Sequence, residues 1–208
     1  GAMLFGASAG LGFSLFLREG QALGAPGGAS IDSFDGLSIN NDQRGGFNFF
    51  LDGTSGGSDD SGVFFDASLV IQEGTISTAA GFSPGTPYIG WFETKINDSN
   101  QILMMSSVDD PNIPSSVDRA LVIANTDGSG GLVSEKVIVK EGDSLAGQAV
   151  VELGTGPHNF AFNNAGQAMF VADLDGATTN DGVVAISDGD TTTIVAQEGT
   201  ASGIQGRN

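Results

Sequence analysis

An internal repeat constrains the fold of this chain more than any other feature of its sequence. One marker of the repeat is a glutamate that precedes a glycine at the end of an apolar run. It occurs at Glu19, Glu73, Glu141 and Glu198, so successive copies lie 54, 68 and 57 residues apart (73−19, 141−73, 198−141). Repetition at a period in the tens of residues is typical of propellers, solenoids and other arrays, in which each unit buries its apolar faces against a neighbour.

A second marker is an asparagine in a turn before an apolar strand. Three stretches that align without gaps share it as Asn40, Asn97 and Asn163. A large apolar residue and then an aspartate follow at fixed distances in every copy: Phe47 and Asp52, Met104 and Asp109, Phe170 and Asp175. An Asn side chain can satisfy backbone groups in a turn and tolerates a left-handed conformation, and Asp-Gly favours a turn. We therefore interpret both recurring residues as structural.

Each unit contains four short segments that are rich in Val, Ile, Phe and Thr and are separated by turn residues. In the third unit the first segment contains Phe160, the second ends at Asp175, and the others are Gly182–Ile186 and Thr192–Ala196. This pattern predicts an all-β chain of four-stranded meander sheets. A lone sheet has an edge and two faces to cover, so neighbouring sheets must stack. We expect a β-propeller-like partial ring; a β-sandwich or another stacked β array is the alternative.

The two markers divide the chain into a half unit and three complete units. Residues 1–20 contain two short apolar runs, Met3–Phe5 and Leu11–Leu17, that match the last two strands of a unit. The divisions are a half unit at 1–20, repeats at 21–74, 75–142 and 143–199, and a tail at 200–208. The sequence thus predicts about three and a half blades with uncovered faces. Either the chain is a fragment of a longer array, or it forms a homo-oligomer through its exposed repeat faces.

The repeat resembles that of bacterial tandem-repeat proteins defined by an Asn-x-x-Gly-x-x-Ala-Phe motif. The third copy carries Asn163, Gly166 and Phe170, with Met169 where that family has alanine. The other copies depart from the motif at Gln43 and Gly46, and at Asn100, Leu103 and Met104. The run 18–27 also resembles the inter-repeat linker of these proteins. The resemblance implies a propeller-like chain that is secreted or displayed on the surface of a bacterium, and it implies no reaction.

Composition narrows the classes of partner. Against 25 acidic residues stand only 7 basic ones, a formal charge of −18, which argues against nucleic acid and anionic membrane surfaces. The chain has no cysteine, which excludes disulfides and thiolate metal sites. The uncharged stretch 3–17 is too short to cross a bilayer, so we expect no membrane insertion.

Two groups of residues are candidate binding sites. Asp173, Asp175, Asn180 and Asp181 offer oxygen ligands around a glycine-containing loop, as calcium requires, although the spacing differs from copy to copy. Calcium is the one cofactor that this pattern suggests. Tyr88 and Trp91 belong to one aromatic cluster, which would either stack on a sugar or partner protein or pack between units.

Catalysis finds little support in the sequence. His158 is the only histidine and follows Pro157 in a loop, and no serine lies in a strand–Gly-x-Ser-x-Gly–helix context. We therefore expect a non-catalytic, exported surface or interaction module that binds an unknown protein or glycan. A calcium- or carbohydrate-binding module is the alternative. A glycoside-hydrolase-like enzyme, which would need two carboxylates converging in one pocket, is the second alternative.

Overall fold

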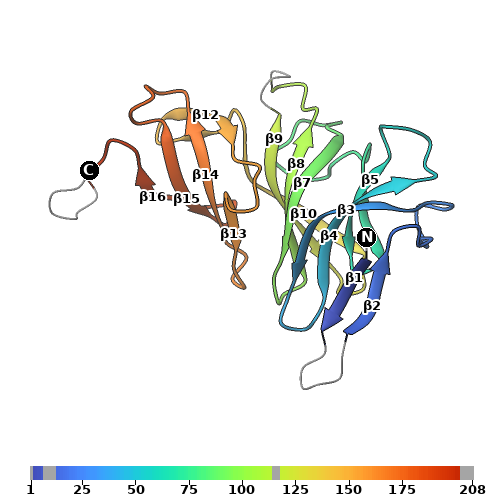
Figure 1. Ribbon diagram of the computed structural model, residues 1–208. Coiled ribbons are helices and arrows are strands. Elements are labelled where there is room, and N and C mark those ends of the chain that lie inside the picture. The colour runs from blue at the N-terminus through green and yellow to red at the C-terminus, as the bar shows by residue number, and fades with distance from the viewer. Residues whose placement is uncertain (1, 7–12, 114–117, 202–208) are drawn as a thin grey trace.

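All named strands pair antiparallel and no helix is present over the residues that the computed structural model describes, which are 2–6, 13–113 and 118–201 (Figure 1). The prediction of an all-β fold is therefore confirmed. Strands β1 (Ala2–Gly6) and β2 (Phe13–Arg18) pair as an N-terminal hairpin. The start of the predicted strand Leu11–Leu17 and residues 202–208 of the predicted tail lie outside the described residues.

Two four-stranded meanders follow the hairpin. Each follows the pattern expected from the sequence, with short β-branched and aromatic strands separated by turns. The first sheet consists of β3 (Ser30–Ile39), β4 (Gly45–Asp52), β5 (Ser61–Phe65) and β6 (Ser68–Gln72). The second sheet consists of β7 (Tyr88–Ile96), β8 (Gln101–Val108), β9 (Arg119–Thr126) and β10 (Leu132–Lys140).

The third sheet keeps this order but divides its first strand in two. Both β12 (Gln148–Leu153) and β13 (Phe160–Phe162) pair with β14 (Ala168–Leu174), whereas β3 alone pairs along the whole of β4. The polar stretch 154–159 separates the two pieces. The sheet is completed by β11 (Ser144–Leu145), β15 (Gly182–Ser187) and β16 (Thr192–Gln197).

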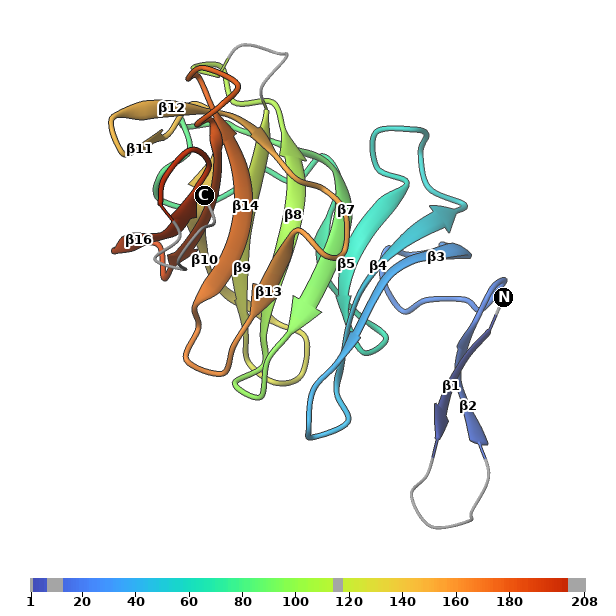
Figure 2. The ribbon, with the colours of Figure 1, turned by 60° about the vertical axis from the view of Figure 1, so that its left-hand side comes forward.

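The sheets stack face to face. Side chains alternate between the two faces of a strand, so alternate residues of each central strand belong to different cores. On β8, Met104 packs with residues of the first sheet such as Phe65, whereas Leu103 and Met105 pack with residues of the third sheet such as Phe170. Each core removes apolar surface from water, which stabilises the stack by about 25 cal/mol per Å² buried. Figure 2 shows the hairpin and the three sheets following one another across the molecule in chain order.

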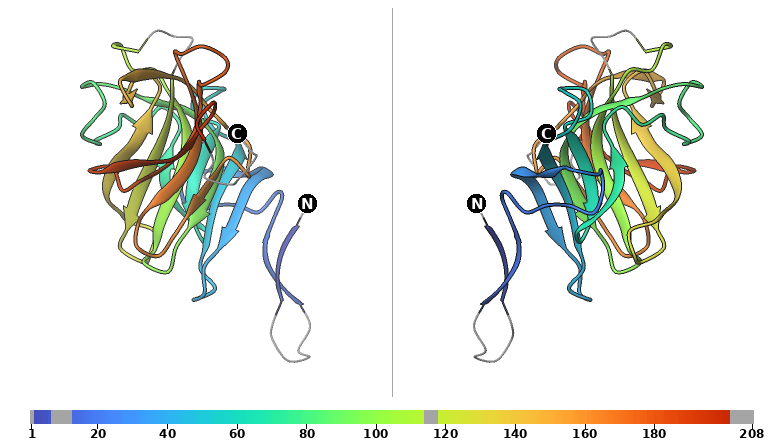
Figure 3. Two further views of the ribbon diagram at one scale, coloured as in Figure 1. Left: turned by 90° about the vertical axis from the view of Figure 1, so that its left-hand side faces the viewer. Right: turned by 90° about the vertical axis from the view of Figure 1, so that its right-hand side faces the viewer.

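The N-terminal hairpin occupies the outer side of the first sheet. Leu17 is buried there with Phe47 and Phe49, and the Phe16 ring lies 6.0 Å from that of Phe47. Figure 3 shows that strands β1 and β2 of the hairpin move away from the first sheet along their length. The hairpin therefore covers only part of that face.

Candidate interaction surface

The three Asn turns have the same internal geometry. In each, the Asn side-chain oxygen accepts a hydrogen bond from the backbone N–H four residues later, at 2.8 Å for Asn40, 3.1 Å for Asn97 and 2.9 Å for Asn163. The residue three positions after the Asn has a positive φ in all copies: 62° at Gln43, 58° at Asn100 and 76° at Gly166. Glycine adopts this conformation without strain, which explains the motif glycine of the third copy.

The same asparagines also join the sheets to one another. Nδ2 of Asn40 donates to the backbone oxygen of Asn97 at 3.1 Å, and Nδ2 of Asn97 donates to the backbone oxygen of Asn163 at 3.0 Å. The first turn therefore bonds to the second and the second to the third. We call this series the Asn ladder.

A parallel series of hydrogen bonds involves the residue after each ladder asparagine. The backbone N–H of Asn41 donates to Oδ1 of Asp98 at 2.8 Å, and that of Asp98 donates to Oδ1 of Asn164 at 3.0 Å. The bond from the Asn41 backbone is the main reason that the pKa of Asp98 lies below its ordinary value. Alignment of the three copies already showed an Asx residue at this position in each, a signal that the sequence reasoning missed.

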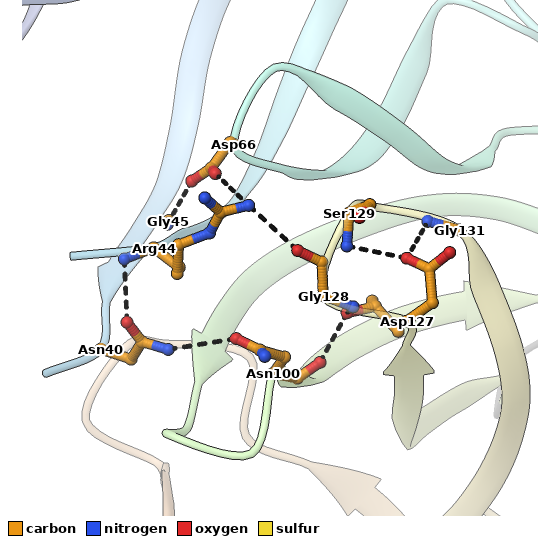
Figure 4. A network of polar contacts seen from close by, with 10 residues as sticks. Asn40, Arg44, Gly45, Asp66, Asn100, Asp127, Gly128, Ser129 and Gly131 are labelled. Atoms are coloured by element: carbon orange, nitrogen blue, oxygen red, sulfur yellow. Dashed lines mark hydrogen bonds and ion pairs between the residues drawn. The ribbon is translucent and has the colours of Figure 1, made fainter. Parts of the chain in front are cut away.

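A third link between the first two sheets centres on Arg44 (Figure 4). Its guanidinium pairs with Asp66 at 3.0 Å, donates to the backbone oxygen of Gly128 at 3.0 Å and lies over the Phe65 ring. Gly128 belongs to the polar loop 127–131 between β9 and β10 of the second sheet. Oδ1 of Asp127 shapes this loop by accepting hydrogen bonds from the N–H groups of Ser129 and Gly131. The loop therefore braces one sheet against the next.

Two of the recurring glutamates, Glu73 and Glu141, accept hydrogen bonds that join strands to one another. Glu141 is buried and accepts hydrogen bonds from the N–H groups of Arg119 at 2.8 Å and Leu153 at 3.1 Å. Burial raises its pKa despite these bonds. Glu73 accepts from the Ser61 hydroxyl at 2.8 Å. The bonds from Ser61 and Arg119 tie the end of the fourth strand to the start of the third strand of the same sheet, and the bond from Leu153 ties the second sheet to the third.

The aromatic residues Tyr88 and Trp91 lie in the core between the first and second sheets. Both are buried, and their rings stack with centroids 5.8 Å apart. The Tyr88 hydroxyl donates to Oε1 of Glu135 at 2.6 Å, and burial raises the pKa of Tyr88. Both rings therefore pack between the first and second sheets, and their contact with a ligand stays a prediction.

The residues predicted to bind calcium lie around the loop between β14 and β15. Oδ1 of Asp175 accepts a hydrogen bond from the Ala149 N–H at 2.8 Å, which ties the loop to β12. The backbone oxygens of Asn180 and Asp181 accept from Gln197 and Leu174, and Asp173 lies on the outer face of the sheet. Within the described ranges, no group of three or more His, Asp or Glu side chains is arranged to hold a metal ion. Calcium binding here stays a prediction.

The outer face of the third sheet is open and carries exposed apolar residues beside polar ones such as Asp173 and Glu198. Met169 and Val171 on β14 and Val195 on β16 are large hydrophobic residues that remain exposed. A hollow of about 890 Å³ lies over this face, lined by Val171, Val184 and Val195 among others. A smaller hollow of about 230 Å³ lies beside the third Asn turn, between Met169 and Ile186. Exposed apolar residues on an open face make it a candidate interaction surface.

Stacked antiparallel sheets joined by repeated Asn turns define an all-β repeat protein. The chain belongs to DUF7453, a family of unknown function whose model matches residues 3–207. No curated protein and no solved structure matches the chain. Among the described residues, none forms a helix long and apolar enough to cross a bilayer.

Proposed function

We propose that this chain is a non-catalytic interaction module, a propeller-like stack of blades whose open third-sheet face binds a protein partner. One comparison within the molecule carries the proposal. Leu103 and Met105 of β8 are 0% and 1% exposed because the third sheet covers them. On β14, Met169 is equivalent to Leu103 and Val171 is equivalent to Met105, because Phe170 is equivalent to Met104. Met169 and Val171 are 43% and 38% exposed.

The repeated polar residues support a structural role for the chain. The asparagines, Asp175 and Glu141 are all engaged with backbone groups that hold turns and strands together. A propeller-like arrangement is supported by the meander order of each sheet, by face-to-face stacking and by the Asn turns, which follow one another along one end of the stack. Export to the bacterial surface is supported by the resemblance of the repeat to the Asn-x-x-Gly-x-x-Ala-Phe proteins.

The experiment that tests the proposal places a photo-crosslinking amino acid at Met169, with the exposed position Val133 on β10 as the control. Irradiation in an extract of the source cells, followed by mass spectrometry, identifies any protein joined at each position. We expect a discrete adduct from position 169 that position 133 does not give and that is reproduced with the purified partner. Equal labelling from both positions, or none from 169, would refute the proposed surface.

A further inference from the structure

Within the described residues, neither end of the stack is covered by a complete neighbouring sheet, and the two ends are complementary. At the C-terminal end, Asn163 has the position that Asn97 has in the second sheet. Nδ2 of Asn97 donates both to its own Gln101 and to the backbone oxygen of Asn163. Nδ2 of Asn163 donates at 3.1 Å to its own Gln167, and no residue in the described part of the chain accepts its second N–H. The Asn ladder therefore ends in a donor.

The parallel series ends in the same way. Asn41 and Asp98 each donate their backbone N–H to the side-chain oxygen of the Asx residue in the next sheet. Asn164 is the next residue of this series, and its backbone N–H meets no such oxygen within the described residues. A partner that continues both series must present a free backbone oxygen followed by a residue with a side-chain oxygen, which a turn with Asn followed by Asx supplies.

The N-terminal end of the stack presents that turn. The first sheet carries Asn40 followed by Asn41. The backbone oxygen of Asn40 accepts the N–H of Gln43 within its turn, as the oxygen of Asn97 accepts that of Asn100. The oxygen of Asn97 also accepts Nδ2 of Asn40 from the preceding sheet, whereas that of Asn40 has no second donor among the described residues. The acceptor missing at one end of the stack is present at the other.

The apolar surfaces beside the two turns match as well. Leu37 and Ile39 of β3 have the positions that Thr94 and Ile96 have on β7, because Leu37 pairs with Phe47 as Thr94 pairs with Met104. Thr94 and Ile96 are 0% and 8% exposed under the first sheet, but Leu37 and Ile39 are 50% and 53% exposed. The N-terminal hairpin leaves this end of the face uncovered.

We infer that the third-sheet face of one copy docks on the first-sheet face of a second copy at the end that the hairpin leaves exposed, with the two Asn turns bonded as neighbouring turns are within the chain. Asn163 of one copy then donates to the backbone oxygen of Asn40 in the next, and Met169 and Val171 pack near Leu37 and Ile39. This inference rests on the proposed function, whose partner it identifies as the chain itself. The contact joins two different surfaces, so it is heterologous and produces a ring or a filament.

Two substitutions on exposed residues test this contact by sedimentation velocity at micromolar concentrations. Val171→Asp places a charge on the third-sheet face and Leu37→Asp on the first-sheet face. We expect the wild type to associate and each variant alone to remain monomeric. An equimolar mixture of the two variants should form a dimer, because each variant retains the surface that the other lacks. Val133→Asp, on the exposed outer strand of the second sheet, should associate as the wild type does.

The salt dependence gives an independent measurement. Each copy carries a formal charge of −18, so repulsion opposes association and added salt should strengthen it. A wild type that stays monomeric at all salt concentrations, or a Leu37→Asp variant that associates normally, would overturn the head-to-tail contact. If the head-to-tail contact fails in this way, a different protein crosslinked to position 169 would still support the proposed interaction module. No adduct at position 169 would refute both the module's binding surface and the head-to-tail contact.

Discussion

The Asn ladder predicts that two equivalent asparagines contribute unequally to stability. Asn97 and Asn163 hold their own turns with the same bonds, but only Asn97 also bonds to the following sheet. Asn97 is 3% exposed, whereas Asn163 is on the surface. Asn97→Ala leaves the N–H groups of Ser99 and Gln101 without their acceptor in a partly buried turn, and it leaves the backbone oxygen of Asn163 without the bond from Nδ2. Unsatisfied buried groups cost about 1–3 kcal/mol each and a lost hydrogen bond about 0.5–1.5 kcal/mol, so we expect a loss of about 2–4 kcal/mol.

Asn163→Ala is the matched control for this substitution. Water can replace the lost bonds of an exposed turn, so we expect a loss of about 1 kcal/mol. For a chain of this size, each kcal/mol lowers the melting temperature by about 2–4 °C, which makes the difference between the two variants measurable by calorimetry and by urea denaturation. Coincident transitions from circular dichroism and tryptophan fluorescence would establish that each variant unfolds as one unit. Equal losses for the two variants would refute the argument that the ladder couples the sheets.

Three further predictions concern the core, the pH dependence and calcium. Phe64→Ala should lower the free energy of unfolding by about 3–5 kcal/mol, because this ring is fully buried, and the exposed neighbouring-strand variant Phe50→Ala should lose far less; similar urea midpoints for the two would contradict this assignment of the core. Asp98 has a lowered pKa in the folded state, so it stabilises the protein above about pH 4 and this contribution is lost as the pH falls through the folded-state pKa. The stability difference between wild type and Asp98→Asn should therefore be largest near neutral pH and shrink in acid, and a constant difference would count against this role. Calcium should leave the melting temperature unchanged, because no group of three or more acidic side chains is arranged to hold a metal ion among the described residues; a rise that Asp175→Asn abolishes would instead establish the predicted metal site.

Much of the local structure could be predicted from sequence because it depends on short-range chemistry. Alternating apolar residues, turn residues and the recurrence of Asn40, Asn97 and Asn163 were sufficient to predict antiparallel meander sheets and a structural role for the asparagines. The internal bonds of each Asn turn span only four residues, so they follow from the motif itself. The recurring Glu residues were recognised by the same repetition, but their backbone partners were not.

The contacts between units depend on how the sheets face one another, and the repeat pattern alone does not specify this. Arg44 reaches the backbone of Gly128, which is 84 positions away, and no local signal marks that pair. Tyr88 and Trp91 had two readings in the sequence, and only stacking of the first two sheets decided that they are buried. The sequence by itself determined the strands and the turns, because these depend on neighbours along the chain. Only the tertiary structure decided which apolar face stays open, because Leu103 and Met169 hold the same place in their strands and differ only in whether another sheet covers them.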